Sequence, residues 1–148
     1  MEKDFRIRPG TIEEAVAISQ LIPEFVDPYG EDMYEKRFTN VSHIILVAEL
    51  QGGEIIGFKS GYERDSDGSF YSWMGGVKPA WRQEGVARSL AHGMEVWARA
   101  NGYHTFRFKT RNCHRAMLHF ALNNEFNVIG FEEAEEVSQH RIWFEKKL

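Results

Sequence analysis

The stretch that most constrains the fold of this chain runs from Trp73 to Gly102 and reads WMGGVKPAWRQEGVARSLAHGMEVWARANG. It has the form of an apolar strand, a short basic turn and a helix. Apolar residues recur along the helix with the spacing of one helical face, at Val86, Leu90, Met94 and Trp97. The turn contains Arg82-Gln83-Glu84-Gly85-Val86-Ala87, an R-x-x-G-x-A pattern. This pattern therefore lies where the turn becomes a helix.

The first turn of this helix is expected to bind an anion. Backbone N–H groups there have no partners within the helix, and the aligned peptide dipoles make that end partly positive. Gly85 has no side chain, so an anion can approach the backbone closely, and Ala87 keeps a neighbouring position small. Arg82 and Arg88 add positive charge, and Ser89 adds a hydroxyl group. The pattern predicts a pyrophosphate ligand.

Gly75 and Gly76 end the preceding strand. Adjacent glycines in a strand indicate a β-bulge or a close approach of another backbone. A strand pulled away from its neighbour leaves N–H and C=O groups unpaired, and a ligand with amide groups can pair with them as an added strand would. Coenzyme A combines a pyrophosphate with an amide-bearing pantetheine arm, so the two features together favour this ligand.

At these residues the chain resembles the GNAT superfamily of N-acetyltransferases, whose acetyl-CoA-binding motif (Q/R)-x-x-G-x-(G/A) follows a strand ending in V-x-P. Val77-Lys78-Pro79 corresponds to the strand end, and Arg82 to Ala87 corresponds to the loop. The order of later segments matches as well: a strand at 104–111, Asn112, a helix with Ala116-Met117-Leu118, and Asn127-Val128-Ile129-Gly130-Phe131. This ordered combination, over most of residues 70–131, is more specific than the short motif alone.

The resemblance implies one domain over residues 1–148 that moves an acetyl group from the cosubstrate acetyl-CoA to a small-molecule or peptide amine. The amine attacks directly in a ternary complex, without a metal. The implied cosubstrate-binding residues are Val77, Arg82, Gln83, Glu84, Gly85, Val86, Ala87, Arg88, Ser89 and Asn112. A backbone N–H at or near Val77 is expected to polarise the thioester carbonyl. Asn112 is expected to cap a helix over residues 113–123, and by resemblance to hydrogen-bond the pantetheine arm.

The resemblance fails at the position of the family's usual general acid. Aligning Phe126 with the phenylalanine of the family's Gly-Phe pair puts Ala121 where many members have a tyrosine that protonates the leaving thiolate. Alanine cannot donate a proton, and the sequence does not choose between Tyr103 and Cys113 as a replacement. A thiolate can also leave unassisted, because a thiol pKa near 8.5 makes it a fair leaving group. A noncatalytic acyl-CoA-binding module is therefore the alternative interpretation.

No catalytic residue is assigned, because the general base is also undetermined. The amine must lose its proton before it attacks, but residues 70–77 of the central strand contain no carboxylate. Glu63, Glu31 and Glu35 are candidates that would act through water, although each is more simply explained as an ordinary surface carboxylate. Glu31 and Glu35 belong to an acidic segment that also contains Glu24, Asp27 and Asp32. That segment is either a solvated surface or a rim that attracts an ammonium group, and the acceptor is not identified.

The remaining segments predict an α+β fold. A strand at 5–8 precedes a helix that begins with a T-x-x-E capping box at Thr11 and Glu14. A short helix ending at Phe38 and strands at 43–50, 54–63, 69–77 and 103–110 follow, with two strands within 126–148. The expected architecture is a GNAT-like, mostly antiparallel mixed sheet of about seven strands, flanked by about four helices.

Composition limits the compartment and the partners. Cys113 is the only cysteine, so no internal disulfide can form, which suits a reducing cytoplasm. No apolar run approaches the roughly 20 residues needed to cross a bilayer, so no membrane partner is expected.

The net charge of -4 disfavours nonspecific nucleic-acid binding. Aromatic and basic residues alternate over 106–109, but a strand with one buried face gives the same pattern. In some family members the final strands join a dimer, so a homodimer is compatible with the sequence.

Overall fold

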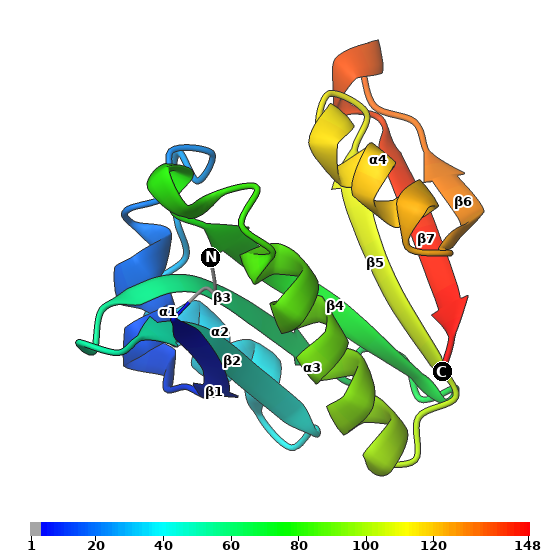
Figure 1. The fold of residues 1–148 in the computed structure, drawn as a ribbon. Helices are drawn as coiled ribbons and strands as arrows, with labels where there is room; N and C mark the ends of the chain where they lie inside the picture. The colour runs from blue at the N-terminus through cyan, green and yellow to red at the C-terminus, as the bar shows by residue number, and fades with distance from the viewer. Residues whose placement is uncertain (1–3) are drawn as a thin grey trace.

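A computed structural model describes residues 4–148. Within this range seven strands form one sheet, and four α-helices lie on its two faces (Figure 1). The strands are β1 (Phe5–Pro9), β2 (His43–Leu50), β3 (Ile55–Tyr62), β4 (Ser69–Val77), β5 (Thr105–Arg111), β6 (Asn127–Glu132) and β7 (Arg141–Lys147). The helices are α1 (Ile12–Ser19), α2 (Glu31–Phe38), α3 (Val86–Ala100) and α4 (Arg115–Asn123), with 3₁₀ turns η1 (Pro79–Trp81) and η2 (Val137–Gln139). None of the helices in the described range has the length and hydrophobicity needed to cross a membrane.

The strand order is β1-β2-β3-β4-β5-β7-β6. Neighbouring strands are antiparallel except β4 and β5, which are parallel and are connected through α3. A parallel pair requires such a crossover, because the chain must return to the end of the sheet where the first strand began before it can form the second strand in the same direction. The predicted mixed, mostly antiparallel sheet of about seven strands with about four helices is confirmed.

β4 and β5 are paired only near their first residues. Three residue pairs join them, from Ser69 with Thr105 to Tyr71 with Arg107. Beyond these pairs the two strands diverge, as Figure 1 shows where β5 and β7 lean away from β4. We call the unpaired segments 72–77 of β4 and 108–111 of β5 the splay. It is the one interruption among the strand pairs within residues 4–148 that leaves neighbouring strand segments unpaired over several residues.

Each face of the sheet is covered by two helices and has its own apolar core. The α3 and α4 face buries Leu46, Ala48, Ile56, Phe70, Val77, Val86, Leu90, Met94, Ala98, Phe106, Phe108, Ala121, Phe126 and Phe144. The α1 and α2 face buries Ala15, Ile18, Ile22, Tyr34, Phe38, Ile45, Val47, Phe58, Tyr62 and Tyr71. The alternation of Phe106 and Phe108 with charged residues is therefore that of a strand with one face in the core.

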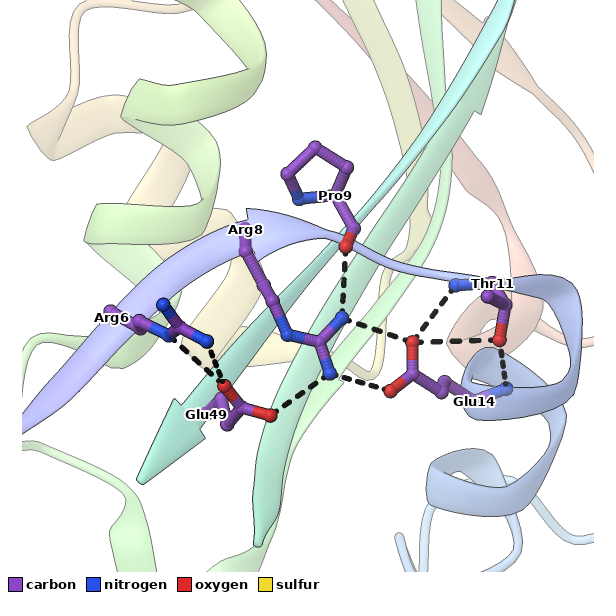
Figure 2. Close-up of polar contacts among 6 residues, drawn as sticks. All are labelled: Arg6, Arg8, Pro9, Thr11, Glu14 and Glu49. Atoms are coloured by element: carbon purple, nitrogen blue, oxygen red, sulfur yellow. Dashed lines mark hydrogen bonds and ion pairs between the residues drawn. The ribbon is translucent and has the colours of Figure 1, made fainter. Parts of the chain in front are cut away.

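The edge strand β1 is held to β2 and α1 by charged side chains (Figure 2). Arg8 donates to both carboxylate oxygens of Glu14, at 3.1 and 2.6 Å, and to Glu49 at 3.0 Å. Arg6 donates to the other oxygen of Glu49 at 2.8 Å. The predicted capping box is confirmed, since Glu14 N–H donates to Thr11 Oγ1 at 3.1 Å and Thr11 N–H donates to Glu14 Oε1 at 3.0 Å. Glu14 therefore serves both the helix cap and the strand network.

The predicted role of Asn112 as a helix cap is wrong. α4 begins at Arg115, and its N-cap residue is His114. Asn112 instead pairs with the segment before β7: its N–H donates to His140 C=O at 2.7 Å and its side-chain amide donates to Val137 C=O at 3.2 Å. Contacts with a segment more than 20 residues away therefore decide where the turn after β5 ends and α4 starts.

Candidate active site

The β-bulge in β4 lies at Trp73, and not at Gly75 and Gly76 where the glycines suggested it. Ser60 pairs with Met74 and Gly61 pairs with Ser72, so Trp73 is the extra residue. A bulge bends its strand and increases the local twist, and this one lies where β4 diverges from β5. The close backbone approach predicted for the glycines is confirmed, because a Cβ on Gly75 would lie 3.2 Å from the Phe58 carbonyl oxygen.

The register of β3 and β4 shows which amide groups of β4 face the splay. Lys78 N–H donates to Ile56 C=O at 2.9 Å, which makes Gly57 and Val77 a non-hydrogen-bonded pair in the antiparallel ladder. The N–H and C=O of Val77 therefore point away from β3 toward the splay, and so do those of Gly75 two residues earlier. Because β5 has diverged there, no neighbouring strand pairs with these groups.

The turn between η1 and α3 leaves the first amides of α3 open. Gly85 is the N-cap with φ of 85°, and no atom lies within 4 Å of the position of an added Cβ. The first bond into the helix runs from Ser89 N–H to Gly85 C=O at 3.0 Å. The N–H groups of Gly85, Val86 and Ala87 have no acceptor within residues 4–148. The predicted open helix start is therefore present, next to the end of β4.

The Arg82 side chain is engaged by protein groups. Its guanidinium donates to both oxygens of Glu24, at 2.8 and 2.7 Å, and its Nε donates to Val77 C=O at 3.0 Å. The hydrogen bonds from Arg82 hold the pKa of Glu24 below its usual value. Arg82 thus joins the turn, β4 and the segment between α1 and α2. Arg88, exposed in the first turn of α3, has no ion pair within the described chain and carries the uncompensated charge.

A groove of about 610 Å³ lies over α3 and reaches α4. Its lining includes Arg88, Ser89, His92 and Glu95 from α3, Phe120 from α4, Asn124 directly after α4, and Lys146 from β7. Lys146 forms an ion pair with Glu95 at 3.0 Å. The groove therefore adjoins the open amides at Gly85 through the same first turn that carries Arg88 and Ser89.

Ala121, the position aligned with the family's tyrosine, is fully buried in the core, so its side chain does not line the groove. The neighbouring residue that lines the groove is Phe120, which has no proton to donate. Neither side chain can therefore act as the general acid.

None of the other candidate acid and base side chains forms a hydrogen bond with the unpaired segments of the splay within residues 4–148. Tyr103 Oη donates to Glu63 Oε1 at 2.8 Å, next to the end where β4 and β5 are still paired. Glu31 and Glu35 are exposed on α2, and Cys113 is exposed before α4. The structure brings none of these groups together with Gly75 and Val77.

The α1 and α2 face of the splay contains aromatic residues that the sequence analysis did not single out. The Trp73 ring contacts the rings of Tyr29, Tyr34 and Tyr62, with centroids 5.5, 4.9 and 5.7 Å away. Burial raises the pKa of Tyr34 to about 12, so this phenol stays neutral near pH 7. The aromatic fraction of 14% was the signal in the sequence, but these residues come from separate segments and nothing local links them.

Comparisons with known proteins agree with this geometry. The family model described as acetyltransferase (GNAT) family matches residues 15–126. The fold is similar to that of the ribosomal-protein-S18-alanine N-acetyltransferase from Escherichia coli, with a TM-score of 0.81, 13% identity, and coverage of 97% of this chain and 93% of that chain. It is also similar to Ard1 from Thermoplasma volcanium, with a TM-score of 0.81, 12% identity and 99% coverage of both chains.

A third similar structure is yncA, a putative acetyltransferase from Salmonella typhimurium with its cofactor acetyl-CoA. Its TM-score is 0.77, with 17% identity and coverage of 98% of this chain and 94% of that chain. No curated protein matches the chain in sequence. At these identities the structural likenesses show a shared fold.

Proposed function

The chain belongs to the acetyltransferase (GNAT) family, which uses acetyl-CoA, and from this premise we propose that it transfers an acetyl group to a primary amine by direct attack in a ternary complex. The observation that carries the proposal is the splay, whose unpaired amides on β4 lie beside the open amides at the start of α3. We further propose that residues 1–148 act as one domain in the cytoplasm.

The residues at the splay fit acetyl-CoA. The pyrophosphate would be held by the open N–H groups of residues 85–87 and by Arg88, with no side chain at Gly85 in the way. The pantetheine arm would pair with the Val77 N–H and the Gly75 C=O, which β4 turns toward the splay. From residue 77 back to residue 73 the strand spans about 13 Å, which leads the arm to the bulge. The side-chain oxygen of Asn112 has no partner within residues 4–148 and can accept from the arm.

When bound, acetyl-CoA supplies a thioester. The chain's contribution is then to orient the reactants and to donate a hydrogen bond from Gly75 N–H, the splay-facing amide nearer to the bulge, to the thioester carbonyl. β4 contains no carboxylate, and Phe120 replaces a proton donor on α4. We therefore propose that solvent removes the proton from the amine and that the thiolate leaves without an acid.

This mechanism predicts how the rate depends on pH. If the chain supplies no general base, kcat/KM rises with pH in step with the deprotonated fraction of the acceptor, and its midpoint follows the pKa of whichever amine is used. Measuring kcat/KM against pH for two amines of different pKa checks this. One midpoint shared by both amines would reveal a titrating group on the protein and contradict the solvent mechanism.

The alternative is a noncatalytic acyl-CoA-binding module, which Ala121 and Phe120 favour because neither can act as an acid. Calorimetry with acetyl-CoA, followed by measurement of CoA release with a panel of amines and peptides, separates the two. Binding with release supports the acetyltransferase. Tight binding without release on any acceptor supports the module, and absence of binding contradicts both proposals.

A further inference from the structure

Four cations and four aromatic rings gather on the α1 and α2 face of the sheet. We call this set the cation–aromatic cluster: Arg37, Arg64, Lys109 and Arg141 with Tyr62, Tyr71, Trp73 and Trp143. Trp73 belongs to the diverging part of β4 and Lys109 to that of β5. The cluster therefore includes residues from both strands of the splay.

Three of the four cations lie over rings of the cluster. Arg141 lies close enough for its charge to lower the pKa of Lys109. The Arg64 guanidinium lies 5.5 Å from the Tyr71 ring and 5.0 Å from the Trp143 ring. Lys109 Nζ lies 5.1 Å from the same Trp143 ring, and Arg37 lies 5.6 Å from the Trp73 ring. A guanidinium over a ring keeps its donor edge free, because the N–H groups lie in its own plane.

These cations have few counter-charges. Arg64 has one ion pair, with Asp65 at 3.4 Å, and Arg37 donates to the Tyr62 hydroxyl at 3.1 Å. The side chains of Lys109 and Arg141 donate to no group within residues 4–148. Glu132 is a second nearby carboxylate, and it accepts a hydrogen bond from the Trp143 indole. Positive charge is thus left over here, although the whole chain has a net charge of -4.

The pKa of Lys109 is consistent with this excess of positive charge. Burial lowers its pKa, and the positive charges of Arg141, Arg64 and Arg37 lower it further, although Glu132 opposes the shift. The same three arginines face the Tyr71 hydroxyl, whose pKa burial raises to about 12. The three arginines therefore disfavour the charged form of Lys109, and an anion bound beside Lys109 would oppose that effect.

We propose that the cation–aromatic cluster binds the carboxylate of the acceptor, so that the acceptor class is small amines that carry a carboxylate on an apolar or aromatic frame. The inference rests on the proposed function. The acceptor amine must lie next to the thioester that it attacks, so the cluster can bind the acceptor only if the thioester ends near Trp73. Arginine pairs with carboxylates through two parallel hydrogen bonds, and the rings enclose the frame between carboxylate and amine. The acidic segment around α2 then lies at the rim and does not select the acceptor by itself.

The test measures binding without requiring turnover. In the presence of CoA, 3-phenylpropionate and 3-phenylpropionamide are titrated into the full chain, since they differ only in the charge of one group. We expect the carboxylate to bind at least about tenfold more tightly than the amide, the scale of one charged hydrogen bond. Arg64→Gln and Lys109→Gln should each reduce carboxylate affinity by a similar factor and leave the Kd of acetyl-CoA unchanged.

Arg99→Gln is the matched control, because Arg99 is an exposed arginine at the end of α3, outside the cluster and the cosubstrate site. Arg99→Gln should change neither the affinity for 3-phenylpropionate nor the affinity for acetyl-CoA.

CoA release should also be faster with L-phenylalanine than with phenethylamine at equal concentrations of free amine. Equal binding of carboxylate and amide, no carboxylate binding at millimolar concentration, or equal losses in Arg99→Gln would overturn the proposal. Failure of the proposed function would appear separately, as absence of acetyl-CoA binding.

Discussion

Gly85 is the residue whose replacement most directly tests the cosubstrate site. Its φ of 85° is unfavourable for a residue with a side chain, by roughly 1–2 kcal/mol, and a carboxylate at this helix start would repel a phosphate. We predict that Gly85→Glu raises the Kd of acetyl-CoA by at least about tenfold, equivalent to about 1.4 kcal/mol. Isothermal titration calorimetry on the folded variant measures this.

The control for that substitution is Gly52→Glu in the turn between β2 and β3. Gly52 also has no atom within 4 Å of an added Cβ, and its φ is not positive. The added charge and size are the same, but Gly52 lies outside the turn that leads into α3. If both variants bind acetyl-CoA as well as the original chain does, the open amides of α3 do not hold the pyrophosphate.

Arg82 shows what residue-level reasoning from the sequence can and cannot reach. The open amides at the helix start are present as predicted, within residues 4–148. The partner of Arg82, however, is Glu24, which lies 58 residues away in the chain. Such a pair depends on the tertiary fold, so the sequence could not distinguish a charge that binds phosphate from one that holds β4 to the turn.

At the scale of elements, local patterns predicted most boundaries. β2, β4 and the start of α3 lie where the hydrophobic spacing put them, and the capping box sets the start of α1. The errors occur where distant segments decide the outcome. The bulge depends on how β4 pairs with β3, and the start of α4 depends on hydrogen bonds from Asn112 to the segment before β7.

The attachment of β1 to β2 and α1 gives a prediction about acid. Hydrogen bonds from Arg8 and then Arg6 lower the pKa of Glu49 from its usual 4.5 to about 2. Because the folded-state pKa is lowered, the contribution of Glu49 is fully present above pH 4.5 and is lost as the pH falls toward about 2. We predict that Glu49→Gln makes the melting temperature less dependent on pH over this interval.

Thermal unfolding followed by circular dichroism at several pH values measures that dependence. Glu133→Gln, an exposed carboxylate after β6, is the control and should keep the pH dependence of the original chain. The same slope in Glu49→Gln and in the original chain would show that the network in Figure 2 does not control the acid sensitivity of the fold.

At the scale of the whole molecule, the site results from how the sheet is divided. The order β5-β7-β6 places the last strand of the chain inside the sheet, next to β5, so β7 supports the side of the splay that has left β4. The groove lined by Arg88 and Ser89 then lies on the α3 face, and the cation–aromatic cluster lies on the other face. A sequence predicts an unpaired strand from its glycines, but it does not show which residues meet across the opening.

Amide hydrogen exchange tests this division directly. In β4 the N–H groups of Gly75 and Val77 face the splay, whereas those of Met74 and Gly76 alternate with them and face β3. We predict fast exchange at Gly75 and Val77 in the free chain and slow exchange at Met74 and Gly76, measured residue by residue by NMR.

Acetyl-CoA should then slow exchange at Gly75 and Val77, and at residues 85–87, by accepting their hydrogen bonds. The amides of edge strand β6 provide the control and should be unaffected. Equal protection of Gly75 and Gly76 in the free chain would mean that β4 and β5 close on each other in solution, and the cosubstrate would then have no strand edge to pair with.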